Sequence, residues 1–310
     1  MTHPRTGRPR ERVLTMRGIG KRFGAVKALT DVDFWVNEGE VVALVGDNGA
    51  GKSTLVKVLA GVHPPDSGSI EFDGEEVGID SPADAQQLGI ETIFQDLALC
   101  DNLDVVANLW LGRELRDGAT LDEVDMEQRT WTLLRELSAK IPSVRVPVAS
   151  LSGGQRQTVA IARSLIGEPR VVILDEPTAA LGVAQTAEVL NLIERLRERG
   201  HGVILISHNM ADVMAVADRV VVLRLGRNNG VYNVADVTSE TLIAAITGAV
   251  DHSVAPRRTP ERAPDRSDAV STAPRDEEQP SVGESAGGTV IRMPHAGSRR
   301  TPRPRGDGRR

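Results

Sequence analysis

A glycine-rich segment of nine residues, Gly46–Thr54, constrains this chain of 310 residues more than any other feature. It follows the apolar run Val41–Val45 and has the spacing G-x-x-x-x-G-K-[ST], which indicates a phosphate-binding loop between a buried strand and a helix. Its glycines let backbone N–H groups point at a polyphosphate, and the helix N-terminus adds partial positive charge. Lys52 would reach the β- and γ-phosphates, and the Ser53 hydroxyl would bind Mg²⁺. The predicted nucleotide-binding residues of this loop are Gly46, Asp47, Asn48, Gly49, Ala50, Gly51, Lys52, Ser53 and Thr54.

Short β-branched runs alternate with helical patterns along residues 12–250, which predicts an α/β fold with a doubly wound or RecA-like sheet. Most of the runs are continuously apolar, as expected for parallel strands that are buried on both faces. The predicted strands are Val41–Val45, Ile70–Phe72, Glu91–Phe94, Val171–Leu174, Val203–Ile206 and Val220–Leu223. The predicted helices are Ser53–Ala60, Ala83–Gln87, Met126–Leu137, Gly153–Ile166, Ala184–Glu198 and Met210–Ala217.

Two carboxylates, Asp175 and Glu176, follow the predicted strand Val171–Leu174. A buried strand would deliver them to the sheet edge where α/β sheets bind ligands. Asp175 is predicted to hold Mg²⁺ through water, and Glu176 to orient and polarise the attacking water. An apolar run that ends in Asp is a weak signal alone, but together with a phosphate-binding loop it becomes a strong one.

The segment Leu151–Gln155 reads Leu-Ser-Gly-Gly-Gln and lies between the phosphate-binding loop and the carboxylate strand. Its glycines, followed by a predicted helix, suggest a second anion site at a helix N-terminus. Phosphate loop, LSGGQ, Asp-Glu strand and His208, in that order, resemble the ATP-binding subunits of ABC transporters over about residues 13–247. The resemblance implies ATP and Mg²⁺ as cofactors. It also implies a RecA-like P-loop NTPase core with an antiparallel β region and a helical subdomain inserted at about 96–165.

The same resemblance assigns roles to residues whose own signals are weak. Ser152, Gly153, Gly154 and Gln155 would contact the γ-phosphate of ATP held by an opposed second subunit. Phe23 would stack on adenine, although an aromatic side chain there is also compatible with a core position. The implied catalytic residues are Glu176, His208 and Gln95, and the implied Mg²⁺ ligands are Ser53, Gln95 and Asp175.

Two stretches, Ile93–Leu103 and Glu176–Val183, resemble the ATPases of ribose- and xylose-type monosaccharide importers. This implies an ATP-hydrolysing subunit that pairs with a second nucleotide-binding subunit, most simply its own copy. It would bind integral-membrane permease subunits at the cytoplasmic face of a bacterial membrane, with an extracellular solute-binding protein as an indirect partner. Leucine and tryptophan within 101–111 would form either an exposed permease contact or the core of the helical subdomain.

Other classes of phosphate-loop protein fit less well. A soluble ABC-type ATPase of translation or DNA repair usually carries tandem modules or a coiled-coil insertion, and this sequence has neither repeats nor sustained heptads. A GTPase would carry an N-K-x-D motif, which is absent. One departure from the family pattern is Gly182, which stands where an aspartate usually ends the loop after the carboxylates. That aspartate would link the two nucleotide sites, so their cross-talk is left open.

Composition sets the remaining limits. A net charge of −6 argues against a nucleic-acid partner, and a single cysteine, Cys100, excludes an intramolecular disulfide. The longest apolar runs are far shorter than the ~20 residues of a membrane span, so a cytoplasmic location is expected. Residues 1–11 are predicted to form a disordered arm and 12–250 the ATP-binding domain. Residues 251–310, with 12 Arg and 8 of the 17 prolines, are predicted to be a disordered tail.

Overall fold

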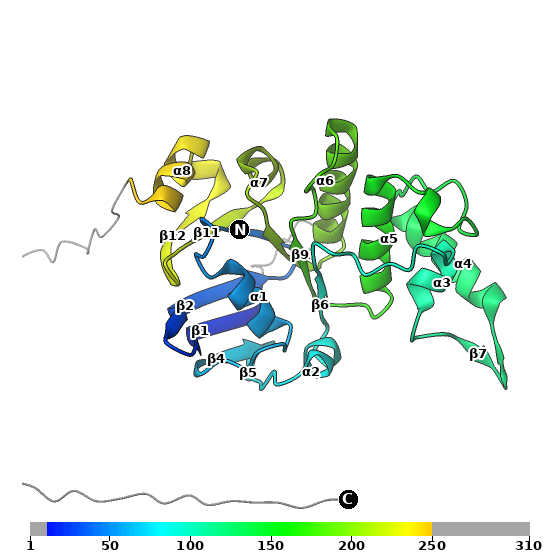
Figure 1. Ribbon diagram of the computed structural model, residues 1–310, viewed down its shortest axis with the longest axis horizontal. Coiled ribbons are helices and arrows are strands. Elements are labelled where there is room, and N and C mark those ends of the chain that lie inside the picture. Colours follow the sequence, from blue (N-terminus) through cyan, green and yellow to red (C-terminus); the bar gives the residue numbers. More distant parts are fainter. Residues whose placement is uncertain (1–10, 250–310) are drawn as a thin grey trace, which may run out of the picture. The chain divides into compact units, whose positions relative to one another are not determined.

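The computed structural model describes residues 11–249, and a six-stranded sheet lies at the centre of this part of the chain (Figure 1). Its strand order is β12-β11-β3-β10-β9-β6. The strands from β11 to β6 run parallel, and β12 pairs with β11 in the antiparallel sense at one edge. The predicted α/β fold with a parallel sheet is therefore confirmed. The strand bounds are β3 Val41–Val45, β6 Ile90–Ile93, β9 Val171–Asp175, β10 Gly202–Ile206, β11 Arg219–Arg224 and β12 Arg227–Asn233.

Eight α-helices are present in the described residues, six of them at the predicted places. Six of these eight helices have a side-chain N-cap, as at α2, where Ser81 accepts the Asp84 N–H, whereas α1 and α6 begin after a glycine. The two helices that were not predicted are α3 and α8. The helix bounds are α1 Lys52–Leu59, α2 Pro82–Gln87, α3 Val105–Trp110, α4 Glu123–Glu136, α5 Gly153–Leu165, α6 Val183–Glu198, α7 Met210–Val216 and α8 Ser239–Thr247.

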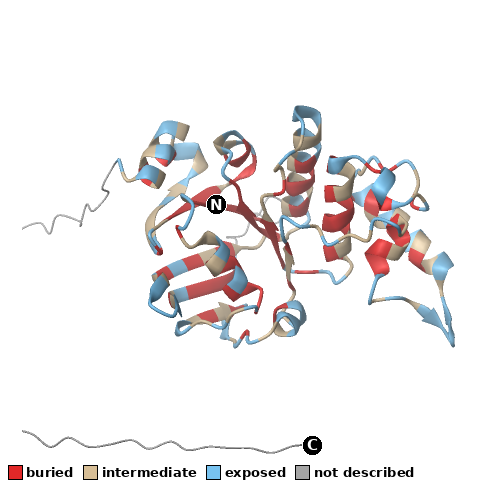
Figure 2. Ribbon diagram, in the orientation of Figure 1, coloured by how far each residue is buried: buried red, intermediate tan, exposed pale blue. Residues whose placement is uncertain are grey.

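Alternate side chains of the central strands enter two hydrophobic cores, one on each face of the sheet. Along β3, Val41, Ala43 and Val45 pack into the core that α3 to α8 complete. Val42 and Leu44 pack into the other core, with α1, α2 and the second sheet. Burial on both faces explains why these strands are continuously apolar, and Figure 2 shows them buried along their length.

The second sheet is antiparallel, with the strand order β2-β1-β4-β5. The predicted strand Ile70–Phe72 belongs here, in β4, rather than to the parallel sheet, because only its Ile70 and Phe72 side chains face the core while Glu71 does not. The antiparallel region that the family resemblance implied is thus present. The bounds are β1 Arg12–Phe23, β2 Val26–Asn37, β4 Ser67–Phe72 and β5 Glu75–Glu76.

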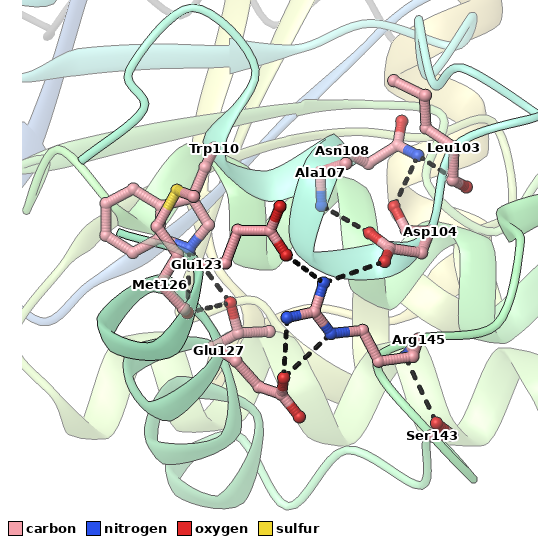
Figure 3. Close-up of polar contacts among 11 residues, drawn as sticks. Leu103, Asp104, Ala107, Asn108, Trp110, Glu123, Met126, Glu127, Ser143 and Arg145 are labelled. Carbon is pink, nitrogen blue, oxygen red and sulfur yellow. Dashed lines mark hydrogen bonds and ion pairs between the residues drawn. The ribbon is translucent and has the colours of Figure 1, made fainter. Parts of the chain in front are cut away.

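The helices α3, α4 and α5 pack together next to the sheet, and α3 contacts both of the others. Leu109 and Trp110 of α3 are buried here, and the Trp110 indole N–H donates to the Met126 carbonyl at 3.1 Å (Figure 3). These two side chains are therefore core residues, whereas Leu111 is 48% exposed. A two-stranded hairpin of β7 Arg116–Asp117 and β8 Thr120–Leu121 connects α3 to α4.

No helix among the described residues is long and apolar enough to cross a membrane. The predicted disordered tail 251–310 lies outside the described residues, as does the predicted arm apart from residue 11.

Candidate functional site

The phosphate-binding loop connects the C-terminal end of β3 to the start of α1 through backbone that only glycine adopts readily. Gly46 has φ 154°, and a Cβ there would lie 2.3 Å from the Leu223 carbonyl oxygen. Gly51 has φ 106°, and its Cβ would lie 2.9 Å from the Ala28 carbonyl oxygen. Any larger residue at either position would clash with backbone, so both glycines are required by the close approach of neighbouring strands.

Lys52 is the first residue of α1, and its side chain folds back over the loop. Its Nζ donates to the carbonyl oxygen of Gly46 at 2.7 Å and to that of Asp47 at 3.2 Å. The helix begins after Gly51, which has no side chain to cap the first N–H groups. A cation and uncapped amides therefore point to the same place, as an anion site at a helix N-terminus requires.

The carboxylates lie at the C-terminal end of β9, next to β3 and β10 in the sheet. Burial, and then the charge of Glu176, raise the pKa of Asp175, while Lys52 opposes the shift. Glu176 follows the strand with φ 53° and anchors its backbone by donating its N–H to the Ile206 carbonyl at 2.9 Å. Its Oε2 lies 2.7 Å from Nδ1 of His208, which follows β10. The parallel strand order brings these residues together, because all three strands end at the same edge.

One cavity of about 520 Å³ connects the loop to the carboxylate end of the sheet. Its lining comes from five separate segments. Four of the lining residues belong to the phosphate-binding loop, namely Gly46, Asp47, Asn48 and Lys52. The other seven are Gln95, Glu176, Ala179, Ser207, His208, Met210 and, from α8, Ile246. A polyphosphate held by the loop would have its far end facing a carboxylate, an imidazole and an amide.

The residues predicted to hold Mg²⁺ offer the oxygen donors that this ion prefers. Ser53 presents a hydroxyl in the first turn of α1, Gln95 an amide oxygen after β6, and Asp175 a carboxylate as the last residue of β9. The raised pKa of Asp175 reflects a half-buried anion next to a second one, and a nearby cation would relieve this strain. The donor set therefore fits the ion.

Two predicted sites lie elsewhere in the described part of the chain. Phe23 ends β1, is 43% exposed and meets the His63 ring edge-on with centroids 5.2 Å apart. Ser152 caps α5, and its hydroxyl accepts the Gln155 N–H while the Gln155 side chain accepts the Ser152 N–H. Neither Phe23 nor the segment 152–155 lines the cavity that contains Lys52.

The two glycines of the LSGGQ segment are explained by packing within this chain. A Cβ at Gly153 would lie 2.9 Å from Leu181, and one at Gly154 would lie 3.1 Å from Cβ of Gln185. The start of α5 therefore lies directly against the start of α6. Gly182, where the family usually has aspartate, caps α6, and a Cβ there would meet open space.

Several site residues were missed by the sequence analysis. Thr178, two residues after Glu176, donates its hydroxyl to Oδ2 of Asp212 at 2.7 Å, and Asp212 is only 5% exposed. Met210 and Ile246 form an apolar wall of the cavity near His208. Asp212 is the acidic residue in the first turn of α7, and this position was a sequence signal for its contact with Thr178. Nothing in the local sequence predicts that α8 reaches the cavity.

Comparisons with known proteins agree with this geometry. A family model described as ABC transporter matches residues 29–179. The chain is 47% identical over 215 residues to the xylose/arabinose import ATP-binding protein XylG of Sulfolobus acidocaldarius, covering 69% of this chain and 86% of that protein. It is 45% identical over 247 residues to the fructose import ATP-binding protein FrcA of Rhizobium meliloti, covering 77% and 95%. A solved ATP-binding cassette of an ABC transporter, in its ADP conformation, matches with a TM-score of 0.67 at 26% identity, covering 77% and 100%.

Proposed function

This chain belongs to the ABC transporter family of ATP-binding proteins, and from that premise we propose that it hydrolyses ATP to power the import of a monosaccharide. The observation that carries the proposal is the cavity that unites Lys52 with Gln95, Glu176 and His208. The two relatives described above, named as xylose/arabinose and fructose import proteins, support the choice of a sugar.

In the proposed mechanism the chain's own groups position the reactants. The loop amides and Lys52 hold the β- and γ-phosphates, and Phe23 stacks on the adenine. When bound, Mg²⁺ neutralises phosphate charge, and Ser53, Gln95 and Asp175 would hold it. Glu176 orients a water molecule against the γ-phosphate and accepts its proton.

His208 then has two roles in the same pocket. In the described conformation it lies within hydrogen-bond distance of Glu176 through Nδ1, which fixes the carboxylate on the side of the cavity. It is largely exposed, with 76% of its side chain accessible, so it can turn toward a γ-phosphate without disturbing the core. We assign to it the contact with the γ-phosphate and to Gln95 the alignment of the attacking water.

Each chain carries two halves of different sites. The segment Ser152–Gln155 at the start of α5 lies outside the cavity that contains Lys52, so it would complete the site of a second, opposed chain. FrcA, of which this chain covers 95%, supports a subunit with a single nucleotide-binding domain. The active unit is then a dimer, most simply of two copies. Permease subunits would bind it at the cytoplasmic face of the membrane, with a solute-binding protein outside.

Nucleotide binding by the isolated chain separates the two halves of the site. Lys52→Ala should abolish turnover and weaken ATP binding, because it removes the main cation at the phosphates. Ser152→Arg should abolish turnover but leave ATP binding to the monomer intact, as measured by titration calorimetry. Loss of monomer binding in Ser152→Arg, or near-normal turnover in Lys52→Ala, would refute the assignment.

Transport is tested by uptake of radiolabelled xylose, ribose and fructose in cells that lack the chain. Wild-type protein should restore uptake of at least one sugar, and Lys52→Ala should not. The soluble alternative would be favoured if the wild-type protein restored growth of these cells without restoring uptake of any monosaccharide, and if it associated with ribosomes.

A further inference from the structure

The segment that follows Gln95 is attached to α5 by two arginine side chains. Arg163 donates from Nη1 to the Ala98 carbonyl at 2.8 Å and from Nη2 to the Leu97 carbonyl at 3.0 Å. Arg156, seven residues earlier and hence on the same face of the helix, pairs with the Asp101 carboxylate at 2.5 Å. Two attachments about 10 Å apart along the helix axis fix both the position and the direction of the segment.

A buried amide holds the other side of the same segment. Asn108 of α3 has no exposed surface, and its Oδ1 accepts the Cys100 N–H at 2.7 Å. Its Nδ2 lies within hydrogen-bond distance of the carbonyls of Cys100, Leu103 and Asp104, as Figure 3 shows for the last two. The Asp104 carboxylate forms an ion pair with Arg145, which also pairs with Glu123 and Glu127 of α4. The segment 97–104 is therefore tied to the helices α3, α4 and α5.

The helix α5 connects Ser152, which the proposed function places at the partner's nucleotide, to the segment after Gln95, which the proposed function places at the chain's own nucleotide. Its N-cap is Ser152, and its last turn contains Arg163, about 16 Å away along the axis. Nine of its residues are buried, so the helix moves as one rigid piece. A displacement at Ser152 must reach the carbonyls of Leu97 and Ala98, which lie two and three residues after Gln95.

We propose that Arg163, assisted by Arg156, is a positioning residue that couples the LSGGQ segment of a chain to Gln95 of the same chain. This rests on the proposed function, in which Ser152 meets the partner's ATP while Gln95 serves the chain's own ATP. ATP that the partner holds against Ser152 would then change the position of Gln95, the residue that aligns water at the chain's own ATP. The link runs inside each protomer and needs no aspartate at position 182, where this chain has glycine.

The bond geometry explains why arginine is needed at position 163. Its planar guanidinium carries several N–H donors in a fixed fork, and here two of them reach successive carbonyls. A lysine would keep the charge but supply a single flexible point donor. Arg163→Lys should therefore preserve folding while loosening the segment, which separates positioning from stability.

The sole cysteine of the sequence, Cys100, lies inside the attached segment and allows a direct test. A trifluoromethyl label on its Sγ leaves the backbone bonds to Asn108 in place. The labelled full-length chain carries Lys52→Ala, which weakens its own ATP binding, and ATP is added below the concentration at which this variant binds it. It is mixed with unlabelled Glu176→Gln chains, which bind ATP without hydrolysing it. Any ¹⁹F shift on adding ATP then reports only nucleotide that the partner holds against the labelled chain's LSGGQ segment.

We expect the resonance to shift with ATP in chains with Arg163 and to stay in place in Arg163→Lys and Arg163→Met. Arg129→Lys is the matched control, because Arg129 is an exposed arginine of α4 whose ion pair within residues 11–249 is with Asp125 of the same helix. In chains that keep Glu176 and Lys52, Arg163→Lys should lower ATP turnover about tenfold, which is within the range typical of coupled sites. The ATP affinity of the monomer should not change.

Light scattering distinguishes the ways in which the test can fail. An ATP-dependent mixed dimer whose resonance shifts equally with and without Arg163 would overturn the coupling while leaving the proposed function intact. The absence of any mixed dimer with Arg163 present would overturn the shared-site arrangement, and the coupling with it. If both Arg163 variants melt at a much lower temperature than the wild-type chain, Asp101→Asn is tested instead. This variant loosens the second attachment at an exposed residue. An unchanged shift in that variant would then count against the proposal.

Discussion

Replacing Glu176 with glutamine isolates the proposed catalytic charge without altering the shape of the site. Glutamine keeps an acceptor oxygen for the His208 Nδ1, which lies 2.7 Å from the carboxylate in the native chain. The backbone at this position has φ 53°, a conformation that glutamate and glutamine tolerate equally. The native Glu176 side chain is only 18% exposed. The substitution therefore replaces a mostly buried charge with a neutral amide of similar size. We therefore expect the variant to fold and melt like the wild-type chain.

The magnitude follows from what is lost and what is kept. General-base assistance contributes about 10²–10⁴-fold in rate, equivalent to roughly 3–5 kcal/mol in the barrier. Because the Glu176 charge helps to raise the pKa of Asp175, removing it lets Asp175 ionise more readily and hold a cation better. The phosphate-binding groups are untouched. The turnover number should thus fall by two to four orders of magnitude while ATP affinity is unchanged or tighter.

The assay pairs phosphate release with light scattering. Glu176→Gln should accumulate as an ATP-bound dimer of doubled mass. Glu168→Gln is the matched control, since Glu168 is an exposed glutamate with φ 49°, outside the cavity. Turnover within threefold of wild type would mean that another group prepares the water. Loss of ATP binding would mean that Glu176 serves the fold or the metal.

Three further predictions concern stability and pH. Thr178→Val removes the hydroxyl partner of the buried Asp212 carboxylate, so we expect a loss of about 1–3 kcal/mol, seen as a lower melting temperature, while Thr178→Ser retains the bond and the stability. Glu40→Ala strands the charge of Arg219, whose Nε lies 2.9 Å from Glu40 with both side chains buried, and should cost about 3–5 kcal/mol in urea unfolding; a loss below 1 kcal/mol would contradict this. Burial lowers the pKa of His201 below its ordinary 6.5, so the stability present above that value is lost as pH falls through the lowered pKa. The melting temperature should therefore drop more between about pH 7 and about pH 5 in wild type than in His201→Asn, and equal drops would exclude this histidine as the cause.

The central sheet was predictable because each of its parallel strands is buried on both faces. Val41–Val45 and Val203–Ile206 are uniformly apolar for that reason, and a run of this kind needs no partner to be recognised. The strands β1 and β2 were missed although each has twelve residues. In β1, four consecutive buried residues, Val13 to Met16, are followed by register shifts between Met16 and Lys21 that interrupt the pattern. In β2, buried and less buried residues alternate regularly only from Val32 onward.

The short helices were missed for a different reason. Length alone does not explain this, because α2 also has six residues and was predicted. Five of the six residues of α3 are buried, and only two of the nine in α8 are, so neither helix shows an apolar face opposite a polar one. End signals did exist for α8, because Thr238 accepts the Thr241 N–H and Gly248 closes the helix with φ 80°. Its importance for the cavity, through Ile246, depends on packing against α7 and β11, which only the folded chain defines.

The motifs of the site were readable because each one is a local backbone device, a loop at a strand end or a cap at a helix start. The contacts that join them were not, since Thr178 and Asp212 are 34 residues apart and Arg163 and Ala98 are 65 apart. These long-range bonds decide which motifs move together. The phosphate loop, Glu176 and His208 sit on adjacent strands of one sheet, whereas Ser152 caps a helix that is bonded instead to the segment after Gln95. A chain built in this way carries hydrolytic groups at one place and a second helix N-terminus at another. It follows from the proposal that a lone subunit binds ATP but hydrolyses it slowly. It also follows that Gln95 is the hydrolytic residue whose position depends on the start of α5.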